Sequence, residues 1–218
     1  MISLIAGVDD AGRGCIIGPL VVAGVVIDEN LVPNLVEVGV KDSKLLSSSE
    51  RTKLSKIVRE VAQQVFVKKV PPDEVDRYVT RGTKFRRLNY LEAVAMGSVV
   101  KELNADVYYV DASDVNPERF GNDVMKNSGK NVDIVSLHHA DREYTVVSAA
   151  SIIAKVERDN EIEELKKIYG DFGSGYSSDP KTRKFLTKWI NEKNFYPEFS
   201  RKSWKTWEKL SLTLDKFQ

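Results

Sequence analysis

Two apolar, β-prone runs near the start of the chain, joined by a short link, place the strongest constraint on its fold. The runs are residues 2–8 and 17–27, and the stretch GVDDAGRG occupies residues 7–14. A tight glycine-containing link between such runs predicts neighbouring antiparallel strands, with Asp9 and Asp10 at the end of the first strand. Adjacent carboxylates repel each other and glycine weakens a strand, so the link has little structural advantage and suggests a functional role.

The remaining hydrophobic pattern alternates helices and strands. Ser47 and Glu50 form a capping box, and Asp179 before Pro180 supplies a helix N-cap. We expect helices over residues 49–63, 84–103 and 148–170, from 180 and from about 201, and strands over 64–70, 105–113 and from 132 towards 141. This order predicts an α/β fold with a mixed central β-sheet flanked by helices, plus a helical C-terminal region. We expect a catalytic domain over 1–193 and a basic helical extension over 194–218.

Composition limits the class of protein. The 218 residues are 42% hydrophobic and 30% charged, which is typical of a globular chain with a substantial core, and the formal net charge is only +1. A single cysteine, Cys15, excludes an internal disulfide and favours a reducing compartment. The sequence has no evident signal peptide or membrane span, so we expect a cytoplasmic location and no membrane partner.

Four aspartates share a structural context in the predicted sheet. Asp9 and Asp10 follow the first strand, Asp111 ends a later strand and Asp141 precedes a long helix. Carboxylates gathered at strand ends favour hard divalent cations such as Mg²⁺. The ordinary alternative is that each caps a helix or lies in a solvated turn. Adjacent strand residues also point to opposite faces, so Asp9 and Asp10 converge only if the strand ends at Asp9 or bulges there.

Seven motifs along the chain together resemble those of the type 2 ribonucleases H (ribonucleases HII), especially the archaeal branch. In order they are GVDDAGRG, IGPLVVAGVV, KDSKLL, YYVDAS, HHAD, VVSAASIIAKVERD and GSGYSSDP. The resemblance implies an RNase H-like fold with a helical C-terminal extension. It also implies an endonuclease that cuts RNA in RNA–DNA hybrids and cuts duplex DNA at single embedded ribonucleotides.

The resemblance assigns the catalytic, metal-binding carboxylates to Asp9, Asp10, Asp111 and Asp141, with two divalent ions, Mg²⁺ or Mn²⁺. At Asp10 the sequence departs from the family, which usually has glutamate there. The side chain keeps its charge and loses one methylene of reach. The departure therefore bears on the efficiency of one metal site and on the preferred ion.

The resemblance also assigns residues to substrate binding. It implies that the backbone of Gly12, Arg13 and Gly14 approaches the 2′-hydroxyl and a neighbouring phosphate, and that Tyr176 stacks on the ribose at the RNA-to-DNA junction. It places Lys41 and Lys44 near substrate phosphates. The 2′-hydroxyl is the group that separates RNA from DNA at such a site.

Two other functions remain open from the sequence. One is a DNA-strand transferase or resolvase of the same fold, and the other is a catalytically impaired protein that binds hybrids. Between Lys181 and Lys205 there are eight basic and two acidic residues, which suits a duplex backbone. We expect a monomer whose partners are RNA–DNA hybrids and ribonucleotide-containing DNA. The C-terminal TLDKFQ is too degenerate to support a sliding-clamp interaction.

Overall fold

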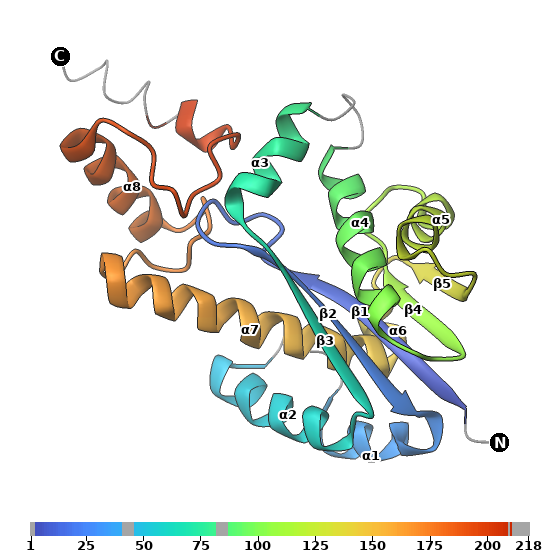
Figure 1. The fold of residues 1–218 in the computed structure, drawn as a ribbon. Coiled ribbons are helices and arrows are strands. Elements are labelled where there is room, and N and C mark those ends of the chain that lie inside the picture. The colour runs from blue at the N-terminus through green and yellow to red at the C-terminus, as the bar shows by residue number, and fades with distance from the viewer. Residues whose placement is uncertain (1–2, 41–45, 82–86, 209, 211–218) are drawn as a thin grey trace. The chain divides into compact units, whose positions relative to one another are not determined.

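In the computed structural model, one mixed five-stranded sheet organises the chain (Figure 1). The structure describes residues 3–40, 46–81, 87–208 and 210. The sheet order is β3-β2-β1-β4-β5. β1 pairs with β2 antiparallel and with β4 in parallel, and β4 pairs with β5 in parallel. The predicted α/β fold with a mixed central sheet is therefore confirmed.

The bounds of the elements follow the sequence pattern closely. The strands are β1 Leu4–Ala11, β2 Leu20–Asp28, β3 Gln64–Val70, β4 Val107–Asp111 and β5 Asp133–Leu137. The helices are η1 Glu29–Leu31, α1 Val32–Glu37, α2 Ser48–Val61, α3 Pro72–Arg81, α4 Arg87–Glu102, α5 Pro117–Ser128, α6 Ala140–Glu143, α7 Thr145–Tyr169 and α8 Pro180–Lys193. Among the described residues, no helix is both long and apolar enough to span a membrane.

Glycines in the central strands let helices approach the two faces of the sheet. A Cβ atom on Gly7 would lie 2.2 Å from the Val146 carbonyl oxygen of α7. A Cβ atom on Gly24 would lie 2.5 Å from the Val99 side chain of α4. Because Gly24 pairs with Val8, the neighbour of Gly7, the two glycines lie on opposite faces. Helices α7 and α4 therefore cover opposite faces of β1 and β2.

Several predicted boundaries are confirmed. The capping box of Ser47 and Glu50 opens α2, Asp179 caps α8, and β3 has the predicted bounds. Other predictions differ from the structure. β1 runs past the carboxylates to Ala11, and β5 ends at Leu137 instead of continuing towards Asp141. Helices η1, α1, α3, α5 and α6 are additional, and the C-terminal helical segment begins at residue 206 within the described part of the chain.

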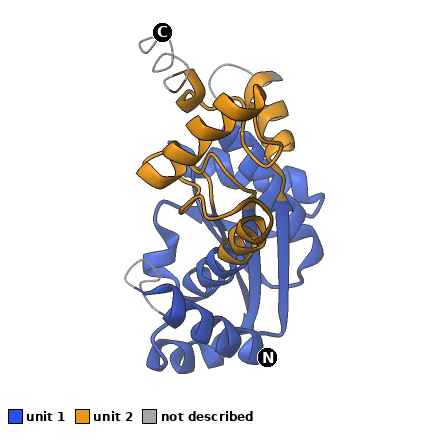
Figure 2. Ribbon diagram, turned by 90° about the vertical axis from the view of Figure 1, so that its left-hand side faces the viewer, with its two compact units in different colours: residues 1–11, 21–69, 88–157 blue, residues 12–20, 70–87, 158–218 orange. Residues whose placement is uncertain are grey.

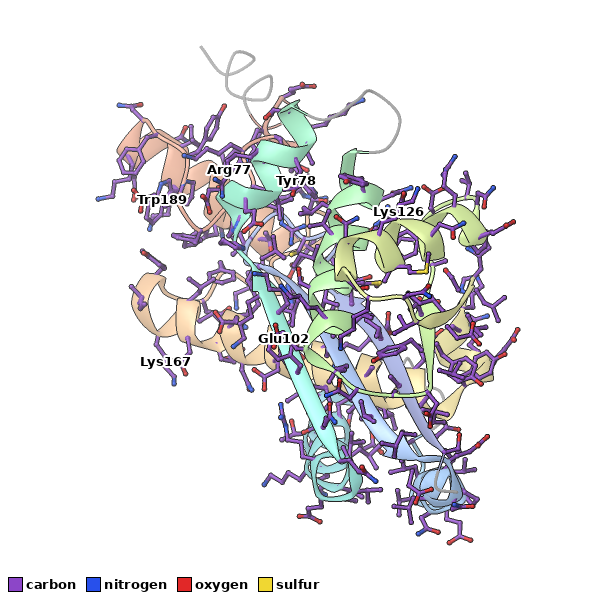
Figure 3. The ribbon with its side chains drawn as sticks, turned by 45° about the vertical axis from the view of Figure 1, so that its right-hand side comes forward. Arg77, Tyr78, Glu102, Lys126, Lys167 and Trp189 are labelled. Atoms are coloured by element: carbon purple, nitrogen blue, oxygen red, sulfur yellow. The ribbon has the colours of Figure 1, made fainter. Side chains whose placement is uncertain are left out.

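The chain divides into two compact units, each built from three segments (Figure 2). The first unit comprises residues 1–11, 21–69 and 88–157, and the second comprises 12–20, 70–87 and 158–218. The first has a core formed mainly by β1, β2, α2 and α7. The second has an aromatic-rich core in which Trp189 of α8, labelled in Figure 3, packs against Phe199.

Candidate functional site

Asp9 is a buried carboxylate inside β1. It pairs with Ala23 of β2, and only 5% of its surface is exposed. It lies two residues after Gly7, so both face α7, whose backbone Gly7 admits. Ser151 lies one turn beyond Val147 on α7 and hydrogen-bonds the Asp9 carboxylate. The close approach of α7 to β1 therefore places a hydroxyl donor on this acid.

The surroundings of Asp9 disfavour its negative charge. Burial raises the pKa of Asp9 well above its ordinary value, and the nearby charges of Asp10 and Asp111 raise it further. Hydrogen bonds from Ser151 and from the Asp10 amide, the latter 2.7 Å from Asp9 Oδ1, lower it only in part. A bound cation would relieve the repulsion among the three carboxylates.

Asp111 and Asp141 belong to the first compact unit, as Asp9 does. Asp111 closes β4, one position beyond the last registered pair of β1 and β4, Val8 and Val110. Its Oδ1 accepts a 2.8 Å hydrogen bond from the Ala140 amide. Asp141 follows Ala140 in α6 and is 5% exposed. The chain reaches α6 through His139, whose φ of 58° makes a tight turn after β5.

Asp10 does not occupy the predicted strand end. β1 continues in regular register through Asp10, which pairs with Val22, and ends at Ala11. The strand therefore neither ends nor bulges at Asp9, which was the condition for the two side chains to converge, because pairing with β2 holds both residues in extended backbone. Asp10 is half-buried and lies on the face opposite Asp9. Its charge still acts on Asp9.

The donor set suits a hard cation, although the side chains do not enclose one. Within the described ranges, no group of three or more His, Cys, Asp or Glu side chains is arranged to hold a metal ion. Mg²⁺ usually binds through one or two protein carboxylates, with substrate phosphates and water completing its shell. The oxygen-only donors and the raised pKa of Asp9 fit that kind of site.

The loop after β1 contains two glycines, Gly12 and Gly14, whose surroundings differ. Gly12 has a φ of +82°, and a Cβ atom on it would lie 2.7 Å from the Pro19 carbonyl oxygen. The fold itself therefore requires glycine at position 12. A Cβ atom on Gly14 would meet no other atom of the described chain within 4 Å, and both Arg13 and Gly14 are exposed. Packing within the described chain therefore does not account for glycine at position 14.

Tyr176 lies beside this loop in the second unit. Cys15 and Tyr176 form an isolated antiparallel bridge, and the Gly175 carbonyl accepts hydrogen bonds from Ile16 and Ile17. The Arg158 guanidinium lies 4.8 Å from the centre of the Tyr176 ring. The structure thus places Tyr176 beside Cys15, the residue that directly follows Gly12–Gly14. Lys41 and Lys44 lie outside the described residues.

Comparisons with known proteins agree on one family. Residues 6–207 match the family model described as Ribonuclease HII. The chain is 43% identical to Ribonuclease HII of Methanosarcina barkeri, over 98% of this chain and 97% of that protein. The chain belongs to the ribonuclease HII family.

Solved structures of ribonucleases HII support the same assignment. The ribonuclease H2 structure from Pyrococcus horikoshii has a TM-score of 0.86 and 40% identity, covering 98% of this chain and 99% of that one. The PCNA:RNase HII complex from Archaeoglobus fulgidus matches with a TM-score of 0.84 and 42% identity, over 94% of this chain and 96% of that one. The RNase H-like fold is therefore confirmed. Ribonucleases HII are metal-dependent nucleases of RNA–DNA hybrids, so the chain is an enzyme of this class.

Sequence reasoning misses two groups that make contacts beside the predicted site residues. On α7, Lys155 Nζ donates to Ser151 Oγ at 2.8 Å, which extends the contacts of Asp9. In the second unit, Arg201 donates to the loop after β1. The spacing of Ser151, Lys155 and Arg158 along one helix face is a readable signal. Arg201 has none, because backbone carbonyls carry no sequence signature.

Proposed function

We propose that the chain is an endoribonuclease that hydrolyses the RNA strand of RNA–DNA hybrids and cuts on the 5′ side of single ribonucleotides in duplex DNA. The products carry 3′-hydroxyl and 5′-phosphate ends. The observation that carries the proposal is the mutual repulsion of Asp9, Asp10 and Asp111 around a buried carboxylate in a ribonuclease HII chain.

The four carboxylates form the metal-binding set of the proposal. Asp9, Asp10, Asp111 and Asp141 bind two divalent ions, Mg²⁺ with Mn²⁺ as a substitute. When bound, the ions supply a water of lowered pKa and neutralise charge on the phosphodiester. Ser151 holds the Asp9 carboxylate through its hydroxyl donor, and the Ala140 amide fixes Asp111.

The second unit supplies recognition of the ribonucleotide. The exposed backbone of Arg13 and Gly14 meets the 2′-hydroxyl and the neighbouring phosphate, and Tyr176 stacks on the ribose. Arg158 holds the Tyr176 ring through its guanidinium, which also donates to the Ser174 carbonyl. Because Gly14 has open space around it, substrate approach is a better reason for glycine there than packing.

The test is cleavage of duplex DNA carrying one ribonucleotide, beside an all-DNA duplex, in Mg²⁺ and in Mn²⁺. We expect cleavage 5′ of the ribonucleotide and none in the control. Asp111→Asn should abolish cleavage and retain binding, whereas Asp133→Asn, an exposed aspartate at the start of β5, should leave both intact. Gly14→Ala should fold normally and lose cleavage.

The outcomes separate the rival functions. Cleavage of the all-DNA duplex would favour a strand transferase or resolvase. Tight binding without cleavage in either metal would favour a hybrid-binding protein. Activity in Mn²⁺ alone would trace to the shortened side chain of Asp10, and Asp10→Glu should then restore activity in Mg²⁺.

A further inference from the structure

Arg201 is a fully buried arginine in the second unit, with 0% of its surface exposed. It belongs by sequence to the basic C-terminal stretch, yet it points inward. Its guanidinium donates to the carbonyl oxygens of Gly12 and Arg13, each at 2.6 Å, and of Gly18 at 3.3 Å. It also lies 3.1 Å from Cys15 Sγ, which in turn donates to the Gly12 carbonyl at 2.9 Å. The contacts converge on the loop that begins with Gly12.

The two shortest bonds set the orientation of two consecutive peptide groups. The Gly12 carbonyl shares its peptide with the Arg13 N–H, and the Arg13 carbonyl shares its peptide with the Gly14 N–H. Both peptides are trans, so each N–H points away from its own carbonyl. Since both carbonyls point to the buried guanidinium, both N–H groups point away from it. Successive N–H groups on one side form a concavity that suits an anion or a hydroxyl oxygen.

The backbone around Arg201 is itself fixed to the same loop. The Arg201 amide donates to the Ile16 carbonyl at 2.8 Å, and Ser200 forms an antiparallel bridge with Ile17. Asp76 of α3 accepts hydrogen bonds from the amides of Lys202 at 2.7 Å and Ser203 at 2.9 Å. The backbone is therefore fixed both before and after Arg201. This keeps the two terminal nitrogens of the guanidinium aligned with the loop carbonyls.

We propose that Arg201 is a positioning residue that directs the N–H groups of Arg13 and Gly14 towards the ribonucleotide, so that the C-terminal segment sets the preference for RNA. The inference rests on the proposed function. Arginine suits the role because its planar fork donates to two acceptors at once, whereas lysine carries one compact ammonium group. Burying such a charge is costly unless its donors find acceptors, and the loop carbonyls accept hydrogen bonds from both terminal nitrogens of the guanidinium.

The experiment compares wild type, Arg201→Lys and Leu186→Ala. Leu186 is buried in the core of the same unit and serves as a control for loss of stability. Binding to duplex DNA with and without one ribonucleotide is measured in metal-free buffer, below the melting temperature of each variant. We expect Arg201→Lys to lower the preference for the ribonucleotide duplex about tenfold, the scale of one lost hydrogen bond. Its affinity for all-DNA duplex should not change, and Leu186→Ala should keep the wild-type preference.

Each other outcome has a defined meaning. A folded Arg201→Lys variant with the wild-type preference overturns the inference and leaves Arg201 a stabilising residue only. Wild type that cleaves but binds both duplexes equally also overturns it, while the proposed activity stands. If Arg201→Lys does not fold, the test uses the backbone amide NMR resonances of the wild-type protein. Shifts of Arg13 and Gly14 on adding the ribonucleotide duplex but not the all-DNA duplex support the inference, and equal or absent shifts overturn it.

Discussion

Asp9 is held in the folded chain with its pKa raised, first by burial and then by the charges of Asp10 and Asp111. Replacing it with asparagine removes the charge and keeps an oxygen that accepts from Ser151 and from the Asp10 amide. We therefore expect Asp9→Asn to raise the melting temperature of the metal-free protein, by about 2–4 °C for each kcal/mol gained. Added Mg²⁺ should stabilise wild type and not the variant, because a ligand stabilises only a state that binds it. Calorimetry with EDTA or Mg²⁺ measures both.

The raised pKa of Asp9 also fixes the direction of a pH effect. The folded state binds the Asp9 proton more tightly than the unfolded chain does. The stability that this protonation contributes is fully present below the ordinary pKa of 3.8. It is lost as the pH rises through the raised value, and a divalent cation offsets the loss. The stabilisation by Mg²⁺ should consequently grow from acid to neutral pH. An equal effect of Mg²⁺ on Asp9→Asn and on wild type would contradict the metal assignment.

At the scale of elements, the loop that carries Tyr176 depends on Asp179. The pKa of Asp179 is lowered to about 2 by hydrogen bonds from the backbone and side chain of Ser174 and from the Lys181 amide. The stability that these bonds contribute is present above the ordinary carboxyl pKa and is lost as the pH falls towards about 2. We expect Asp179→Ala to unfold more easily than wild type near neutral pH, with the difference vanishing in acid. Denaturant titrations at both pH values measure it.

A matched control and a functional readout accompany that substitution. Glu192→Ala, on the exposed last turn of α8, removes an ion pair of 3.7 Å and should have little effect at either pH. Asp179→Ala should also weaken binding to the ribonucleotide duplex, because it loosens the turn that holds Tyr176. Unchanged binding of the ribonucleotide duplex would contradict a role of Tyr176 in substrate binding.

The elements also show how far the sequence could predict the fold. Strong local signals predict β3, the cap of α2 and the start of α8 correctly. Pro72 is a plausible stop for β3, yet proline at the first turn also begins helices, as it does in α3 and α5. The predicted end of β1 is wrong because pairing with β2, a tertiary effect, carries the strand through Asp9 and Asp10. The contacts of Arg201 join positions almost two hundred residues apart, and no local pattern encodes them.

At the scale of the whole molecule, the chain passes repeatedly between its two compact units. The second unit combines residues 12–20, 70–87 and 158–218, so no single cut separates it from the first. The C-terminal segment within it has two kinds of basic residue. Arg201 is buried against the loop after β1, whereas Lys184 and Lys193 of α8 are exposed. Of these three, only the two exposed lysines are available to a duplex backbone.

The exposed lysines lead to a prediction about salt. We expect the double variant Lys184→Gln, Lys193→Gln to bind duplexes more weakly, with a salt slope lower by about 0.9 for each phosphate that the protein no longer neutralises. The weakening should be equal for ribonucleotide-containing and all-DNA duplexes, since phosphate contacts carry no information about the 2′-hydroxyl. Lys101→Gln is the control. Lys101 is exposed near the end of α4, which leads to the start of β4, and Asp111 lies at the other end of that strand. A slope unchanged in the double variant would remove α8 from the duplex-binding surface, and a weakening confined to the ribonucleotide duplex would assign these lysines to ribose recognition instead.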